Sequence, residues 1–141
     1  DDLVEIQGGR PTPGIGFAMG MERLLELVSI EDRHFGVPPH AYLLGVEPVA
    51  ARLGLAERLR ERWRGLRLVT DLPGGSFKAQ FRRADRSGAR VALVLGEQEI
   101  NDGSVSVKDL QGDAPQRTLA QEALTDWLRD LFAAGRRENN K

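Results

Sequence analysis

The sequence lacks cysteine altogether, which excludes disulfide bonds, thiol catalysis and zinc–thiolate sites. It has only two histidines, His34 and His40, and neither has a carboxylate partner at metal-ligand spacing, so we expect no bound metal. No apolar run approaches the ~20 residues of a membrane-spanning helix. The start at Asp1-Asp2 has none of the features of a signal peptide. We therefore expect a cytoplasmic protein, or a piece of one, without a membrane partner.

An excess of charge of either sign is also missing, because the formal net charge is only −1. Any basic surface must therefore be local. The 141 residues suit one domain of usual size with an appendage. Breakers at Gly36, Pro38 and Pro39 predict a boundary. The predicted parts are an N-terminal segment over 1–32, a linker over 33–39, a main domain over 40–133 and a flexible polar tail over 134–141.

The N-terminal segment is predicted to contain two strands and a helix. Residues 3–7 suggest a short strand, and the glycine-rich stretch 14–20 suggests a second strand that runs into a helix. The helix is indicated by apolar residues that recur at spacings of three and four. These residues are Met21, Leu24, Leu25 and Val28.

The main domain shows strands alternating with helices, which predicts parallel strands joined by right-handed crossovers. Short connections after residue 95 require antiparallel pairing at one side of the sheet. We therefore expect an α/β fold, with a mixed sheet and helices on both faces. The predicted strands are 41–46, 66–70, 90–95, 104–110 and 116–119, and the predicted helices are 48–64, 77–87 and 120–132.

Apolar spacing predicts which helix side chains face the sheet. Pro48 is expected to open the first helix and Ser76 to cap the second. The expected inward residues are Val49, Leu53, Ala56, Leu59 and Trp63 in the first helix, Phe77, Phe81 and Ala84 in the second, and Leu124, Trp127, Leu128, Leu131 and Phe132 in the third.

A basic ridge is predicted on the middle helix, where Lys78, Arg82 and Arg86 follow at four-residue spacing and Arg83 lies beside them. Such a ridge at a glycine-rich helix start suits phosphate groups. The alternative is the solvated outer face of an amphipathic helix. Spacing alone leaves both interpretations open.

The stretch "GEQEIN", residues 96–101, follows the central strand at the edge where ligands of open α/β sheets gather. Glu97 and Glu99 could accept hydrogen bonds from nucleobases, with Lys108 completing the surface. Alternatively, the stretch is a polar turn that caps the strand. Enzyme signatures are absent from the sequence, since no serine lies in a nucleophile elbow and the glycines at 14, 16 and 20 do not match a dinucleotide fingerprint.

Two stretches resemble a known family. "GIGFAMGMERL" resembles motif 3 of class II aminoacyl-tRNA synthetases, and the longer "GGRPTPGIGFAMGMERLLELV" is similar to the version found in histidyl-tRNA synthetases. "GGSFKAQFRRADRSGARVALVLGEQEINDGSVSVKDL" resembles the anticodon-binding domain of the same enzymes. The resemblance implies a three-layer α/β domain, with a five-stranded mixed sheet containing one antiparallel strand and three helices. A strand–helix remnant of the class II catalytic domain would precede it.

The resemblance also implies a function, the ATP- and Mg²⁺-dependent ligation of histidine to tRNA(His) through a histidyl-adenylate by a homodimer. The motif 3 arginine, which contacts the ATP phosphates, corresponds to Arg23. The glycines that let the backbone approach adenine correspond to Gly16 and Gly20. The residues that would contact the anticodon loop are Lys78, Arg82, Glu99 and Lys108.

The family's motifs 1 and 2 and its histidine-binding residues are missing from the sequence. We therefore expect a C-terminal fragment that binds the anticodon and is catalytically inert by itself. One alternative is the synthetase-like regulatory subunit of ATP phosphoribosyltransferase, which residues 41–132 argue against. Another is a free-standing anticodon-domain-like interaction module, which the motif 3 stretch argues against.

Overall fold

The computed structural model describes residues 3–12, 14, 16–27, 36–46 and 48–138. The chain divides into two compact units, Asp1–Gly36 and Val37–Lys141. No helix among the described residues is long and apolar enough to cross a membrane.

The first unit contains two short helices, α1 (Leu3–Ile6) and α2 (Met21–Leu27). The strand predicted over 3–7 is wrong, because the segment forms one helical turn closed by hydrogen bonds such as Gln7 N–H to the Leu3 carbonyl at 3.1 Å. A strand needs a neighbour for its backbone groups, and the described residues of this unit supply none. The predicted strand over 14–20 is likewise not regular structure in its described residues.

The helix predicted from residue 21 is confirmed for α2, and its last predicted apolar residue, Val28, lies outside the described residues. The described side chains of residues 3–27 are all exposed, including the apolar ones. The first unit therefore buries no core of its own in the described residues.

The second unit is built on one sheet with the strand order β2-β1-β3-β4-β5. β1 pairs in parallel with β2 and β3, whereas β4 pairs antiparallel with both β3 and β5. Only β4 runs against the others, so the predicted mixed five-stranded sheet with one antiparallel strand is confirmed. The strands are β1 (Ala41–Gly45), β2 (Leu68–Thr70), β3 (Val91–Leu95), β4 (Ser104–Asp109) and β5 (Arg117–Ala120).

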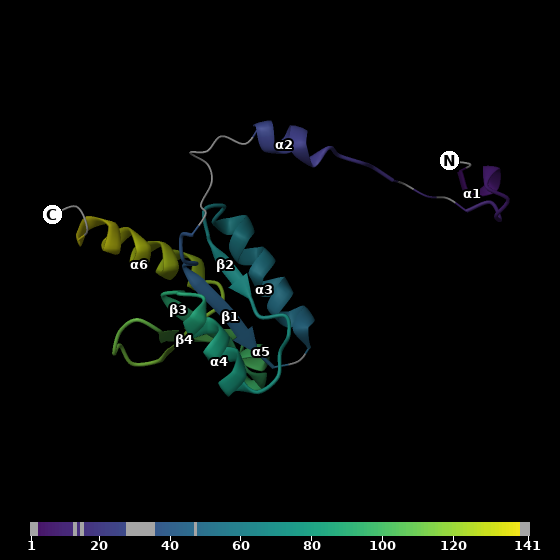
Figure 1. Ribbon diagram of the computed structural model, residues 1–141. Helices are drawn as coiled ribbons and strands as arrows, with labels where there is room; N and C mark the ends of the chain where they lie inside the picture. Colours follow the sequence, from purple (N-terminus) through teal and green to yellow (C-terminus); the bar gives the residue numbers. More distant parts are fainter. Residues whose placement is uncertain (1–2, 13, 15, 28–35, 47, 139–141) are drawn as a thin grey trace. The chain divides into compact units, whose positions relative to one another are not determined.

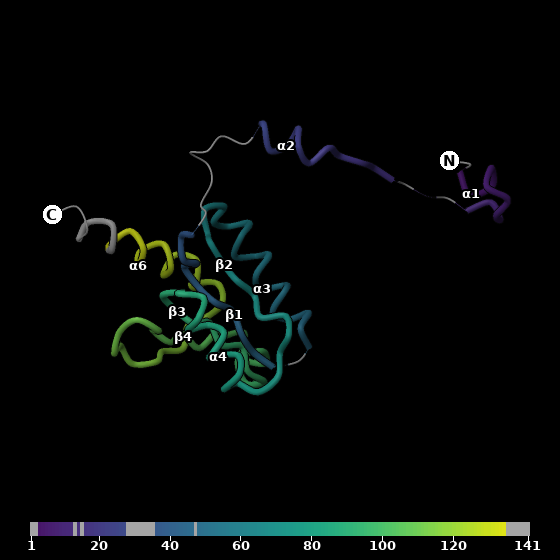
Figure 2. The backbone as a smooth tube through the Cα atoms, viewed as in Figure 1, coloured from purple at the N-terminus to yellow at the C-terminus, as the bar shows by residue number. Residues whose placement is uncertain are grey.

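Helices cover both faces of this sheet (Figure 1). They are α3 (Val49–Arg62), α4 (Phe77–Arg86), α5 (Glu97–Asp102) and α6 (Leu124–Glu138). Side chains of α3 and α6 pack with Ala41, Leu43 and Leu93, while α4 packs with the alternate residues Tyr42 and Ala92. Figure 2 shows the chain returning from β1 through α3 to β2, the crossover that parallel neighbours require.

The buried stripe of α3 differs from the predicted one because an arginine belongs to it. Arg52 has no exposed surface, and its Nη1 donates to the carbonyl of Gly45 at 3.1 Å. The stripe therefore runs through Arg52, Leu55, Ala56 and Leu59, and Leu53, predicted to face inward, is 41% exposed. Apolar spacing could not reveal this rotation, since it counted Arg52 as an outward residue.

α4 begins where the sequence predicts, with the Ser76 hydroxyl accepting a hydrogen bond from the Ala79 N–H at 3.3 Å. Its buried residues are Gln80 and Ala84, whereas Phe77, predicted to face inward, is 39% exposed. Gln80 takes the inward position because its amide exchanges two hydrogen bonds with the backbone of Gly45, each 3.0 Å long.

Three further features depart from the prediction. "GEQEIN" is mostly helix, not a turn, because the Glu99 carboxylate accepts the Gly96 N–H and because Gly103 ends α5 in the left-handed conformation at φ 64°. α6 begins at Leu124, since residues up to Ala120 pair with β4 as β5. α6 also continues through Glu138, so the tail predicted to be flexible from residue 134 is helical over its first part.

Candidate nucleic-acid interface

The basic ridge predicted on α4 exists, with Lys78, Arg82 and Arg86 exposed on successive turns. Within the described residues, none of these three side chains enters a hydrogen bond or ion pair. Their charges are therefore available to solvent or to an anionic ligand. The ridge begins one residue after Phe77, whose exposed ring adds an apolar surface beside it.

Arg83, predicted to accompany the ridge, points away from it. Its guanidinium forms a two-pronged ion pair with Asp71, at 2.7 Å (Nε to Oδ2) and 2.9 Å (Nη2 to Oδ1). The same carboxylate accepts the Tyr42 hydroxyl at 2.8 Å and the Gly74 N–H at 2.9 Å. Arg83 thus holds the loop before α4 against the end of β2, and it is a structural residue.

The ion pair sets the ionisation of its buried members. Burial tends to raise the pKa of Asp71, but hydrogen bonds from Arg83, Tyr42 and Gly74 outweigh it, so this pKa lies below its usual range. Burial, together with the neighbouring Asp71 carboxylate, raises the pKa of Tyr42. At neutral pH the network therefore holds a carboxylate and a neutral phenol, and α4 is fixed to the sheet in one position.

Lys108 lies on the same side of the sheet as the ridge. It is opposite Ala92 in the β3–β4 register, and Ala92 packs in the cluster beneath α4. Its Nζ lies 5.1 Å from the centre of the Phe81 ring, a cation–π contact that joins β4 to α4. The structure therefore brings Lys108 together with α4, whereas the sequence pattern grouped it with Glu97 and Glu99.

Glu99 lies near this surface, but its carboxylate already has partners. Oε2 accepts the Gly96 N–H at 3.1 Å, and Oε1 accepts the Ser106 hydroxyl at 2.7 Å. Ser106 in turn lies 3.2 Å from the Thr118 hydroxyl on β5. The capping interpretation accounts for both contacts, while the remaining lone pairs of the carboxylate leave it able to accept from a base. Glu97 is exposed at the start of α5.

Sequence reasoning missed two features of this interface. Phe77 and Leu72 expose 39% and 61% of their surface beside the start of α4, although apolar spacing placed Phe77 in the core. Exposed aromatic rings next to cations are the usual platform for stacked bases. The second feature is the series of contacts from the Glu99 carboxylate to the Ser106 hydroxyl and from there to the Thr118 hydroxyl. These residues come from α5, β4 and β5, so no local sequence pattern predicts their contacts.

The three residues predicted to contact ATP lie in the first unit. Arg23 lies on α2, where every described side chain is exposed. A Cβ added at Gly16 would meet nothing within 4 Å, and one at Gly20 would meet only the Arg23 Cβ at 4.0 Å. The described residues therefore place no neighbouring group close to either glycine, and the ATP-contact role of these three residues stays a prediction.

The histidines show no metal site either. His40 is buried, stacks on Trp63 with ring centres 5.0 Å apart, and accepts the Arg67 N–H at 3.1 Å. His34 lies outside the described residues. The described part of the chain holds no group of three or more potential ligands that could bind a metal ion.

Comparison with known proteins decides the class of this domain. A family described as "Anticodon binding domain" matches residues 42–131, which include α4, β4 and the interface above. The chain belongs to the anticodon-binding domain family. This match confirms the predicted anticodon-binding domain, whose sheet is as predicted but which has four helices in its described residues, α3 to α6, where three were predicted. The resemblance to histidyl-tRNA synthetases is confirmed by curated relatives.

Curated relatives of this chain are named histidine–tRNA ligase. The protein from Alkalilimnicola ehrlichii is 53% identical over 131 residues, covering 91% of this chain and 30% of the relative. The protein from Halorhodospira halophila is 48% identical over 139 residues, which cover 95% of this chain and 32% of the relative. The chain thus spans about a third of the length of these relatives. Histidyl-tRNA synthetase from Nostoc shares the fold, with a TM-score of 0.59 over 79% of this chain and 26% of its own, at 22% identity.

Proposed function

We propose that this chain supplies the anticodon-binding part of a histidine–tRNA ligase and binds the anticodon loop of tRNA(His). The observation that carries the proposal is the single surface formed by α4 and β4 within an anticodon-binding domain. On it, the ridge cations Lys78, Arg82 and Arg86 lie exposed and without protein partners among the described residues, and Lys108 adjoins them.

The ridge would hold the loop backbone. Cations at successive turns of a helix follow a phosphate chain, and neutralising phosphates releases counterions, so binding weakens as salt rises. Lys78 lies in the first turn of α4, where backbone N–H groups and the helix dipole also favour anions. These contacts position the RNA but do not distinguish its sequence.

Base recognition would fall to the edge formed by Glu99 and Lys108. A carboxylate accepts from base amino groups, and an ammonium donates to base oxygens and ring nitrogens. Glu99 is held in place by Gly96 and Ser106, so a base that donates to it would meet a fixed acceptor. Phe77 would supply a stacking surface beside the backbone contacts.

The longer protein would charge tRNA(His) with histidine, with ATP and Mg²⁺, as a cytoplasmic homodimer. Its ATP contacts would include Arg23, Gly16 and Gly20. In the described part of this chain Arg23 lies exposed on α2, and the family's motifs 1 and 2 are missing from the sequence. The 141-residue chain is therefore expected to bind RNA without activating histidine.

The test is a titration of the chain with a fluorescent tRNA(His) anticodon stem-loop and with a stem-loop of identical stem and changed anticodon. We expect tighter binding to the first, and equal or absent binding to both would overturn the proposal. Lys78→Ala should weaken binding to both RNAs and lower the salt slope by about one. Arg64→Ala, an exposed arginine just beyond α3, is the matched control and should change neither.

Glu99→Gln separates base recognition from general attraction. It keeps the shape of the side chain and an oxygen for Ser106, but one carboxylate acceptor becomes a donor. We expect a change in the affinity ratio between the two stem-loops. Uniform weakening by the same factor would assign Glu99 to strand capping alone.

A further inference from the structure

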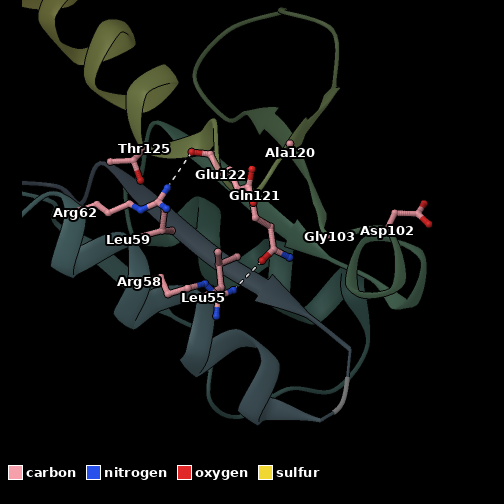
Figure 3. A pocket seen from close by; sticks show the side chains of 10 residues that line it. All are labelled: Leu55, Arg58, Leu59, Arg62, Asp102, Gly103, Ala120, Gln121, Glu122 and Thr125. Carbon is pink, nitrogen blue, oxygen red and sulfur yellow. Dashed lines mark hydrogen bonds between the residues drawn. The ribbon is translucent and has the colours of Figure 1, made fainter.

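A polar cavity lies on the opposite side of the sheet from the α4 surface. It has a volume of about 470 Å³ and lies between α3, the end of α5 and the connection from β5 to α6. Figure 3 shows the side chains of Arg58 and Arg62 extending from α3 toward this connection. Leu55 and Leu59, from the same helix, form the buried base of the cavity wall and are only 1% and 2% exposed.

The two arginines are arranged as a pair of donors. They are four residues apart on α3, so they project from one face of the helix. Arg58 Nη2 donates to Gln121 Oε1 at 2.8 Å, and Arg62 Nη1 donates to the Glu122 carbonyl at 3.0 Å. Each guanidinium carries five N–H donors, and each of these contacts uses one. The contacts hold both groups at the cavity wall with donors to spare.

A buried hydroxyl provides an independent indication of a ligand. Thr125 lies in the first turn of α6, is only 2% exposed, and lines the same cavity. Its Oγ1 has no hydrogen-bond partner among the described residues. In Figure 3 this oxygen points toward the Arg62 side chain. Buried hydroxyls are normally paired, so one aimed at a polar cavity indicates a group that would pair with it.

We propose that this cavity binds the phosphate group of a nucleotide. Guanidinium pairs match phosphate oxygens, and the N-terminus of the 15-residue α6 adds the favourable end of a helix dipole. The exposed Asp102, which also lines the cavity, would accept from ribose hydroxyls. The site is separate from the α4 surface and does not depend on anticodon binding.

The nucleotide can be free or part of an RNA strand, and the experiment distinguishes these sources. The 141-residue chain is titrated, with NMR detection of backbone amides, with adenosine 5′-monophosphate, adenosine and a short single-stranded RNA. We expect saturable shifts around residues 120–126 with the phosphate-bearing probes and none with adenosine. Shifts with the mononucleotide assign a free nucleotide, and shifts with the RNA alone assign a strand. No shifts there with either probe would overturn the proposal.

Variants separate binding from folding. Arg62→Gln should weaken binding of the phosphate-bearing probe by about tenfold, whereas Arg64→Gln, the same change just beyond α3, should leave it unchanged. Thr125→Val removes only the hydroxyl, so the midpoint of thermal unfolding without ligand should stay equal or rise, while affinity falls by about threefold or more. Unchanged affinity in both Arg62→Gln and Thr125→Val would reduce the residues to a structural link between α3 and α6.

Neither result bears on the anticodon surface. Stem-loop discrimination by the α4 surface should persist in Arg62→Gln, and the mononucleotide shifts should persist in Lys78→Ala. Failure of one proposal therefore leaves the other measurable.

Discussion

Replacing Asp71 by asparagine should strongly destabilise the second unit. Asp71 is 1% exposed and accepts hydrogen bonds from Arg83, Tyr42 and Gly74. Asparagine keeps the size and one acceptor oxygen, but it removes the charge and turns a second acceptor into a donor. Arg83 is partly exposed, so its guanidinium can turn toward water when the carboxylate is removed. The Tyr42 hydroxyl is buried, so the loss of its acceptor at position 71 accounts for most of the lost stability.

The expected loss in the free energy of unfolding is about 2–3 kcal/mol, since a buried donor left without its acceptor costs about 1–3 kcal/mol and bonds to charged groups are the stronger ones. For a unit of about 100 residues, this corresponds to a fall of about 10–20 °C in the unfolding midpoint. Thermal unfolding followed by circular dichroism at pH 7 measures it. Asp85→Asn is the control, because Asp85 is an exposed carboxylate on the same helix as Arg83.

The direction of the Asp71 pKa shift determines how the stabilisation by this residue changes with pH. Because the pKa of Asp71 is lowered on folding from its ordinary value of 3.8, the unfolded chain binds this proton more tightly than the folded chain. The stabilisation is complete above the ordinary pKa and is lost as the pH falls below it toward the folded value. Asp71→Asn should lack this acid-dependent component. An unfolding midpoint equal to that of the Asp85→Asn control at pH 7, with an unchanged acid profile, would refute the reasoning.

Three other predictions concern two glycines, the Ser106 hydroxyl and the activity of the purified chain. Gly45→Ala should prevent stable folding, because the new Cβ would collide with the Leu95 carbonyl oxygen. Gly54→Ala, inside α3, would bring the new Cβ only to 3.4 Å from an Arg58 side-chain nitrogen and should stabilise the domain by about 0.5–1 kcal/mol. Urea unfolding of both variants measures the difference. Ser106→Ala should leave folding nearly intact yet narrow the stem-loop affinity ratio, since Glu99 loses its hydroxyl donor; an unchanged ratio would count against a positioned Glu99. The purified chain should show no histidine-dependent ATP–pyrophosphate exchange, and measurable exchange would contradict the proposed division of function.

The strand–helix alternation was predictable because it depends on local spacing. β3 is apolar throughout, and Ser76 begins α4 with a side-chain cap that its residue type makes common. The choice between parallel and antiparallel neighbours also followed from connection length. These features depend on residues close together in the sequence, so the sequence alone carried enough information for them.

What failed depended on distant partners. Arg52 is buried because the carbonyl of Gly45 accepts from it, and this rotates α3 so that Leu53 faces solvent. Arg83 leaves the predicted ridge because Asp71, at the end of β2, captures its guanidinium. A spacing argument treats every arginine as outward, and only the fold shows which ones have a buried acceptor.

The candidate site was predictable in part for the same reason. The ridge of Lys78 and Arg82 follows from helical spacing, and Lys108 from strand alternation across the paired register with β3. The Arg58–Arg62 cavity had no comparable signal, because four of its ten lining residues lie within 120–125, far in the sequence from those on α3. A sequence pattern describes a single helix or strand, whereas residues from several elements form a cavity.

The lengths of the strands have a consequence for how this domain behaves in concentrated solution. The outermost strands are the shortest of the sheet, with three residues in β2 and four in β5, while the inner strands have five or six. Each rim of the sheet therefore presents few free backbone groups to a neighbouring molecule. Short edge strands disfavour the edge-to-edge pairing by which β-sheets aggregate. The domain can therefore expose its charged surfaces to RNA while a second copy of the chain has little edge on which to extend the sheet.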